Sequence, residues 1–231
     1  MPAAIIFDFD GVIADTEPLH FRAFRKVLAG RGIDLCQEEY FGRYLGLNDA
    51  TLLRRLCSDR GLALPDVSSI RELKDAEYER LIEAGLELLP GVRSLIERSA
   101  AHRPLAICSG ARRKEILMVL RQHGLTDYFA AVVATEDVPL SKPDPAGFRR
   151  ALELLRKESP SLRADECLVI EDSLLGIQAA RAAGMRVLAV LGPVGHPARV
   201  EYDRRAAEAD WNCESLEELD VEKLALRTHT R

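Results

Sequence analysis

The chain has 231 residues, of which 47% are hydrophobic, and this is enough to build a full core in one or two domains. Its formal net charge of −5 argues against nucleic acid as a partner, because binding to a phosphate backbone needs a concentrated excess of lysine and arginine. The five cysteines form no CxxC pair, which indicates free thiols in a reducing compartment. No apolar run approaches the ~20 residues of a membrane span and the first residues carry no basic leader, so we expect a cytoplasmic protein without a membrane partner.

The first predicted element is a buried strand over residues 3–9, an apolar run rich in Ile and Phe that ends in a turn. Residues 16–88 then follow helical spacing almost throughout, and Pro18 suits the first turn of a helix. Further helices in this part are predicted over 48–60 and 69–84.

Beyond residue 90, short apolar runs alternate with helical stretches. The runs predict strands over 105–108, 131–134, 167–170 and 186–191. Such βα units force a parallel sheet with right-handed crossovers and helices on both faces. We therefore predict an α/β fold, in which a Rossmann-like parallel-sheet core (residues 1–15 and 90–231) carries an inserted all-helical domain (residues 16–89).

Reactive groups in an open parallel sheet gather at the carboxyl ends of the strands. The predicted strand ends and the loops after them carry acids, one hydroxyl and one ammonium: Asp8, Asp10, Glu171, Asp172, Ser109 and Lys142. A strand running into a turn explains Asp10 and Gly11, but it leaves Asp8 ionised in an apolar strand without a partner. Because strand side chains alternate, Asp8 and Asp10 share one side of the chain, and two carboxylates there suit covalent catalysis, in which one attacks and the other moves protons.

Glu171 and Asp172 end another predicted strand and precede a helix. Helix capping by Asp172 or Ser173 is the simpler explanation, but capping alone does not require two adjacent acids at a buried strand end. Together with Asp8 they make an all-oxygen site, which selects a hard cation, and we predict Mg²⁺.

Ser109 and Gly110 open a predicted helix, so the hydroxyl and the N–H groups that follow it form an anion site, although serine is also an ordinary helix cap. Lys142 lies in a turn between Ser141 and Pro143. It is either a solvated lysine in a rigid turn or a fixed cation that offsets the carboxylates and holds a phosphate oxygen.

In this order the residues resemble the haloacid dehalogenase superfamily of phosphotransferases. Its four motifs match Asp8-Phe9-Asp10-Gly11-Val12, Ser109, Lys142-Pro143 and Glu171-Asp172, and the resemblance spans essentially the whole chain. The helical insertion after the first motif resembles the type I cap of that superfamily. The stretches 15–20 and 141–145 are similar to the branch that contains β-phosphoglucomutase and sugar-phosphate phosphatases.

The resemblance implies a role for each residue. Asp8 is the nucleophile that becomes an aspartyl phosphate, and Asp10 is the acid/base. Mg²⁺ is held by Asp8, by the backbone carbonyl of Asp10 and by Asp172, with Glu171 nearby. The transferring phosphoryl group is bound by Ser109, Gly110 and Lys142. Two positions next to the cap hinge, which in this branch can tune Asp10 or touch the substrate, are Thr16 and His20.

We therefore expect an Mg²⁺-dependent phosphatase of small phosphate monoesters, sugar phosphates foremost. Its partner is a small phosphorylated metabolite, and the protein is a monomer or a small homo-oligomer. The nearest alternative is a sugar-phosphate mutase of the β-phosphoglucomutase type, which needs a basic group in its cap to hold a second phosphate. The corresponding region, 46–49, ends in the acid Asp49, although Arg54 or Arg55 could substitute.

Two further alternatives remain. Dehalogenation through an aspartyl ester needs neither Mg²⁺ nor a second acid, so Asp10 and the Glu171-Asp172 pair count against it. A non-catalytic phosphate-binding module is disfavoured by the intact motifs, yet a sequence by itself does not prove turnover.

Overall fold

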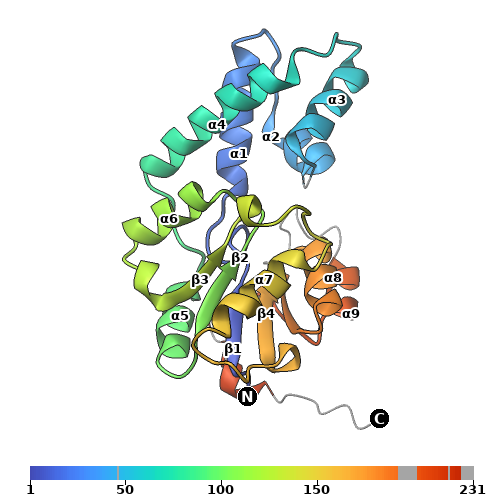
Figure 1. The fold of residues 1–231 in the computed structure, drawn as a ribbon. Helices are drawn as coiled ribbons and strands as arrows, with labels where there is room; N and C mark the ends of the chain where they lie inside the picture. Colours follow the sequence, from blue (N-terminus) through green and yellow to red (C-terminus); the bar gives the residue numbers. More distant parts are fainter. Residues whose placement is uncertain (46, 192–201, 218, 225–231) are drawn as a thin grey trace. The chain divides into compact units, whose positions relative to one another are not determined.

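The computed structural model describes residues 1–45, 47–191, 202–217 and 219–224 (Figure 1). The chain divides into two compact units, one formed by Met1–Asp15 with Glu87–Arg231 and the other by Thr16–Leu86. We call them the sheet unit and the helical unit. The predicted division placed the boundaries after residues 15 and 89, and the role of the helical unit as a cap stays a prediction.

The sheet unit is built on a six-stranded sheet with the order β3-β2-β1-β4-β5-β6. All five strand pairings are parallel, which confirms the predicted α/β class. The strands are β1 (Ala4–Phe7), β2 (Leu105–Cys108), β3 (Phe129–Val133), β4 (Cys167–Glu171), β5 (Arg186–Val190) and β6 (Trp211–Cys213). The edge strand β6 was not predicted, because three half-exposed residues are too short for a hydrophobic pattern to stand out.

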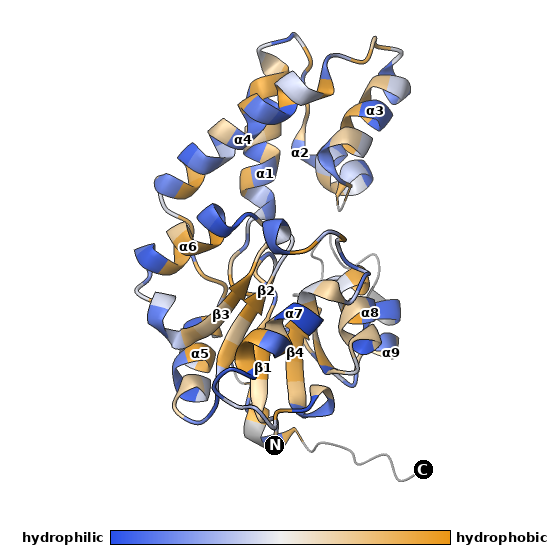
Figure 2. Cartoon of the chain, viewed as in Figure 1, coloured by the Kyte–Doolittle hydropathy of each residue, from blue (hydrophilic) through white to orange (hydrophobic). Residues whose placement is uncertain are grey.

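The central strands β1 and β2 are hydrophobic along their whole length because helices pack on the sheet (Figure 2). α7 packs against β2 and β3, and α8 packs against β4 and β5. Ile6, Ala106 and Val169 of the strands share a buried core with Phe148 of α7 and Ile177 of α8. The helices of this unit are α5 (Val92–Ala100), α6 (Arg113–Gln122), α7 (Ala146–Leu155), α8 (Leu174–Ala182) and α9 (Tyr202–Glu208). Short 3-10 turns lie at Thr126–Tyr128, Thr135–Asp137, Ala164–Glu166 and Val221–Lys223.

The prediction that Ser109 and Gly110 open a helix was wrong. α6 begins at Arg113, and its N-cap residue Arg112 has extended backbone angles. The hydroxyl of Ser109 accepts a hydrogen bond from the N–H of Ala111 at 3.0 Å, so it closes a local turn before the helix starts.

The helical unit consists of α1 (Glu17–Ala29), α2 (Gln37–Glu39), the π-helical segment η1 (Tyr40–Tyr44), α3 (Asp49–Arg60) and α4 (Val67–Glu83). Its core joins Phe24 and Leu28 of α1 to Leu53 of α3 and Ile70 of α4. No helix in the described part of the chain is long and apolar enough to cross a membrane.

The two chain segments that border the helical unit lie side by side in the sheet unit. Ala14 forms an antiparallel bridge with Leu88, and the N–H of Leu89 donates to the carbonyl of Ile13 at 2.9 Å. The helical unit is therefore an insertion between two adjacent points of the sheet unit.

Candidate active site

Asp8 stands directly beyond the last residue of β1. Its N–H donates to the carbonyl of Ile170 at 2.9 Å, which continues the pairing of β1 with β4 past the end of the strand. The side chain is buried, and Lys142 Nζ lies 2.8 Å from its Oδ1. Burial raises the pKa of Asp8 to about 7; the charge of Lys142 acts in the opposite direction, and Glu171 and Asp10 add to the rise.

Three acids from two strand ends meet at this point. Asp8, Glu171 and Asp172 each offer a carboxylate oxygen, and these oxygens lie within 4.8 Å of one another. Burial, followed by the charges of Glu171 and Asp8, raises the pKa of Asp172 well above its ordinary value. Three carboxylates, two of them buried and that of Asp172 half-buried, leave negative charge over beside one ammonium, and their all-oxygen donor set fits a hard divalent cation such as Mg²⁺.

Two glycines keep room for these carboxylates. Gly11 has φ +72°, and a Cβ there would come within 2.1 Å of Asp172 Oδ2. A Cβ on Gly176, in the first turns of α8, would lie 1.8 Å from Glu171 Oε1. The small residue at each position is therefore required by the acid beside it.

Glu171 is completely buried, and both of its oxygens are engaged. Oε1 accepts a hydrogen bond from Lys142, and Oε2 accepts from the N–H and the hydroxyl of Ser173 at 2.8 and 2.9 Å. The hydroxyl of Ser173 also accepts from the N–H of Gly176 at 3.0 Å. Ser173, rather than Asp172, is therefore the N-cap of α8.

Lys142 is a fixed cation, not a solvated one. Its Nζ contacts the carboxylates of Asp8 and Glu171 and lies 5.3 Å from the centre of the Phe148 ring. Burial alone would lower the pKa of Lys142, but the charges of the two carboxylates outweigh it and raise that pKa well above its ordinary value. Asp144 closes a turn before the following helix, because its Oδ1 accepts from the N–H of Ala146 at 2.9 Å; the N-cap of α7 is Pro145.

Three further predicted residues of the sheet unit are Ser109, Gly110 and Asp10. Ser109 is buried directly after β2, the strand that pairs with β1, and its N–H donates to the carbonyl of Val133 at 3.0 Å. Gly110 is exposed in the loop that follows. Asp10 is half-buried, and its charge contributes to raising the pKa of both Asp8 and Glu115.

Thr16 and His20 belong to the helical unit. Thr16 is buried at the residue before α1. The ring of His20 stacks on that of Tyr78, with 4.1 Å between centroids and 6° between planes. Burial, with a smaller effect of the nearby Lys74 charge, lowers the pKa of His20 to about 3, so its imidazole is neutral at neutral pH. Roles for both residues in catalysis or substrate contact stay predictions.

Arg205 was missed by the sequence analysis. It lies on α9 with 4% of its surface exposed, and its Nη1 donates to the main-chain carbonyl of Asp172. The two residues are 33 positions apart, and no local pattern in the sequence connects them.

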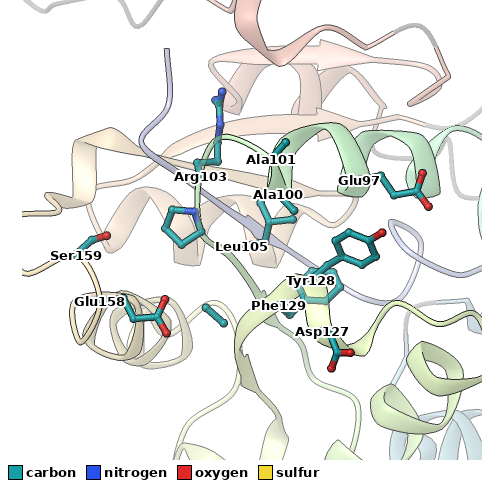
Figure 3. A pocket seen from close by; sticks show the side chains of 12 residues that line it. Glu97, Ala100, Ala101, Arg103, Leu105, Asp127, Tyr128, Phe129, Glu158 and Ser159 are labelled. Carbon is teal, nitrogen blue, oxygen red and sulfur yellow. The ribbon is translucent and has the colours of Figure 1, made fainter.

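The cavity drawn in Figure 3 lies where the strands of the sheet begin. It has a volume of about 730 Å³ and is lined by Leu105 and Phe129, the first residues of β2 and β3. Asp8 and Ser109, by contrast, follow the last residues of their strands. This cavity is therefore separate from the acidic cluster.

The sequence is similar to a known protein family and to several of its members. The sequence model of the haloacid dehalogenase-like hydrolases matches residues 5–190. The protein CbbY of Rhodobacter capsulatus is 32% identical over 222 residues, which cover 92% of this chain and 93% of that protein. The fructose-1-phosphate phosphatase YqaB of Escherichia coli is 34% identical over 186 residues, covering 79% of this chain and 93% of the phosphatase.

Solved structures of similar proteins have the same fold as this chain. CbbY from Rhodobacter sphaeroides in complex with phosphate has a TM-score of 0.76 and 29% identity, covering 95% of this chain and 96% of that one. A putative β-phosphoglucomutase from Thermotoga maritima has a TM-score of 0.75 and 29% identity, covering 95% and 98%.

Proposed function

The chain belongs to the haloacid dehalogenase-like hydrolase family, and from this premise we propose that it is an Mg²⁺-dependent phosphatase acting on small phosphate monoesters, sugar phosphates foremost. Relatives named as phosphatases of phosphorylated carbohydrates, of fructose 1-phosphate and of phosphoglycolate support a phosphoric monoester hydrolase. The observation that carries the proposal is the contact of Lys142 with both Asp8 and Glu171, beside the carboxylate of Asp172.

The first step is attack by a carboxylate oxygen of Asp8 on phosphorus. A phosphate monoester is a dianion and repels an anionic nucleophile, so the site must neutralise charge before the two can meet. Lys142 supplies one fixed positive charge beside Asp8. The bond from phosphorus to the ester oxygen breaks, and an aspartyl phosphate and the alcohol result.

The residues proposed to hold Mg²⁺ are Asp8, Asp172 and the backbone carbonyl of Asp10. When bound, the ion supplies positive charge to the phosphoryl oxygens. Glu171 lies within reach, but its oxygens already accept from Lys142 and Ser173, so we assign to it the orientation of Lys142.

Asp10 is proposed to donate a proton to the departing ester oxygen and then to take one from the water that attacks the aspartyl phosphate. That attack releases inorganic phosphate and regenerates the carboxylate of Asp8. The transferring phosphoryl group is proposed to be held by Lys142, by the hydroxyl of Ser109, which can donate while its oxygen accepts from Ala111, and by the N–H of Gly110.

The test is hydrolysis of generic phosphate esters by the purified protein with Mg²⁺. We expect turnover that EDTA abolishes and that Mg²⁺ restores, and a loss of at least about 10³-fold in Asp8→Asn, because the amide is no nucleophile. Asp127→Asn, an exposed acid lining the cavity in Figure 3, is the matched control and should keep full activity. A protein inert toward a broad panel of esters would favour the non-catalytic module instead.

A mutase is the second candidate, since the similar structures include a putative β-phosphoglucomutase. The side chains of the helical unit favour a hydrolase over a mutase. Its buried Lys74 lies 3.3 Å from Asp49 Oδ2, so the acid at the position where a mutase needs a base offsets the positive charge of Lys74. Arg54 and Arg55 are exposed on α3, and Gly46 lies outside the described residues. An assay primed with a sugar bisphosphate distinguishes the two, because only a mutase would interconvert sugar monophosphates faster than it releases phosphate.

A further inference from the structure

Arg205 is a buried cation that the proposed mechanism does not use. It lies in the middle of α9, and 4% of its surface is exposed. Arginine is rarely buried to this extent unless its donors are satisfied, because removing a guanidinium from water is costly. One partner that the structure gives it is the main-chain carbonyl of Asp172.

The backbone of Asp172 belongs to neither a strand nor a helix. It lies between the end of β4 and Ser173, the N-cap of α8. On one side its carboxylate is bounded by Gly11, where a Cβ would come within 2.1 Å of Oδ2. The hydrogen bond from Arg205 fixes its carbonyl, and a fixed peptide plane limits the directions in which the side chain can point.

α9 has other attachments to the sheet unit. Gln178 Nε2 donates to Glu208 Oε1 at 3.3 Å, and Arg181 Nη1 donates to the carbonyl of Glu208. Arg181 lies in the last turn of α8, the end away from Asp172, and it is exposed. It therefore makes the same kind of guanidinium–carbonyl contact between α8 and α9 without reaching the acids.

We propose that Arg205 is a positioning residue of the metal site, which holds the Asp172 backbone so that the carboxylate is aimed at Mg²⁺ before the ion binds. This inference rests on the proposed function. Groups that orient metal ligands typically change metal affinity about 10–100-fold when they are removed. The positive charge of Arg205 acts in the opposite sense, because it repels a divalent cation, so the sign of the measured change decides which effect is larger.

The experiment is calorimetric titration of the full-length, metal-free protein with MgCl₂. We expect Arg205→Met to bind Mg²⁺ about tenfold more weakly than the wild type and Arg205→Lys, which keeps a donor, to recover part of the loss. Arg181→Met should bind Mg²⁺ like the wild type. In steady-state assays the Mg²⁺ concentration for half-maximal activity should rise in Arg205→Met, while turnover at saturating Mg²⁺ stays within about twofold.

Two results would overturn the inference. Either Arg205→Met binds Mg²⁺ as tightly as the wild type or more tightly, or Arg181→Met weakens binding as much, which would make the attachment of α9 the cause. If Arg205→Met does not fold, Arg205→Gln carries the same expectation, because its amide is too short to replace the guanidinium. A wild-type protein that binds no Mg²⁺ would refute the proposed function itself, whereas equal binding by wild type and variants refutes only the role of Arg205.

Discussion

Burial determines what the individual side chains of this protein can do. Lys142 keeps its charge because two carboxylates contact it. Glu171 has no exposed surface, and its two oxygens accept hydrogen bonds from Lys142 and Ser173. The same acid on a surface would be hydrated and would orient nothing. In the interior, an unmet charge is so unfavourable that each of these groups fixes the position of the next.

His20 should make the protein sensitive to mild acid. Its folded-state pKa is about 3, against an ordinary value of 6.5, so between these values the unfolded chain binds a proton that the folded chain does not. Stability therefore falls as pH drops below about 6.5, and one such group accounts for about 1 kcal/mol between pH 7 and pH 5.5. His20→Phe keeps a ring against Tyr78 and removes the proton, so it should lose that much less over this range.

Urea unfolding at the two pH values, followed by circular dichroism, measures the difference. The other histidines are common to both proteins and cancel in the comparison. Equal losses in wild type and variant would show that His20 is protonated without cost in the folded state.

Gly176 gives a second test at this scale. Alanine normally stabilises a helix interior by up to about 1 kcal/mol relative to glycine, but here its Cβ would lie 1.8 Å from Glu171 Oε1. We expect Gly176→Ala to destabilise the protein by about 1–3 kcal/mol and to reduce turnover. Gly42→Ala, in η1 where no neighbouring atom lies within 4 Å of a Cβ, should be neutral or stabilising. Thermal unfolding of both variants checks this, and similar behaviour of the two would contradict it.

At the level of elements, the junction between β4 and α8 combines a helix cap with the orientation of the Glu171 side chain. The hydroxyl of Ser173 accepts from Gly176 to start the helix and donates to Glu171. Asn48 performs only the first task in the helical unit, where its Oδ1 accepts from the N–H of Thr51 at 3.0 Å at the start of α3. The two residues therefore separate capping from orientation.

Removing either cap should cost about 1 kcal/mol of stability. Only Ser173→Ala also removes the hydroxyl hydrogen bond to Glu171 Oε2, which leaves that oxygen with the N–H of residue 173 and weakens the orientation of Glu171 and, through it, of Lys142. We therefore expect its turnover at saturating Mg²⁺ to fall about tenfold, while Asn48→Ala keeps wild-type turnover. Urea midpoints and initial rates of the two variants measure both effects. If the turnover of Ser173→Ala matches that of Asn48→Ala, Glu171 does not depend on the serine hydroxyl.

At the level of the whole molecule, every acid of the cluster belongs to the sheet unit. The flanking segments of the helical unit are joined by the Ala14–Leu88 bridge, so residues 16–86 can be replaced by a short Gly/Ser linker without stretching the chain. We expect this variant to fold and to keep Mg²⁺ affinity within a few-fold, because its ligands remain. If the helical unit closes over the site and excludes water, the variant should hydrolyse esters at least about tenfold more slowly and distinguish less among them.

The readouts are calorimetric Mg²⁺ titration and the ratio of kcat/KM values over a panel of phosphorylated sugars, phosphoglycolate and nucleotides. Unchanged ratios and turnover would show that the helical unit is not a cap.

Local patterns predicted most of the fold because the signals for strands and helices lie within a few residues. The continuous apolar runs of β1, β2 and β4 reflect burial of the sheet, and the predicted parallel arrangement follows from the helices between them. Where a signal was weak or shared, prediction failed. Serine is a common helix cap, but the hydroxyl of Ser109 closes a turn instead. Strand β6 is too short to show a hydrophobic pattern.

By itself, the sequence determined which chemical groups stand at the strand ends, because a carboxylate in or beside an apolar strand is visible from its immediate neighbours. Only the tertiary structure decided which of these groups contact one another. Lys142 meets Glu171 across 29 positions of the chain, and Arg205 meets Asp172 across 33. Such contacts arise from the packing of whole elements, which fixes distances between residues that have no influence on each other's local conformation.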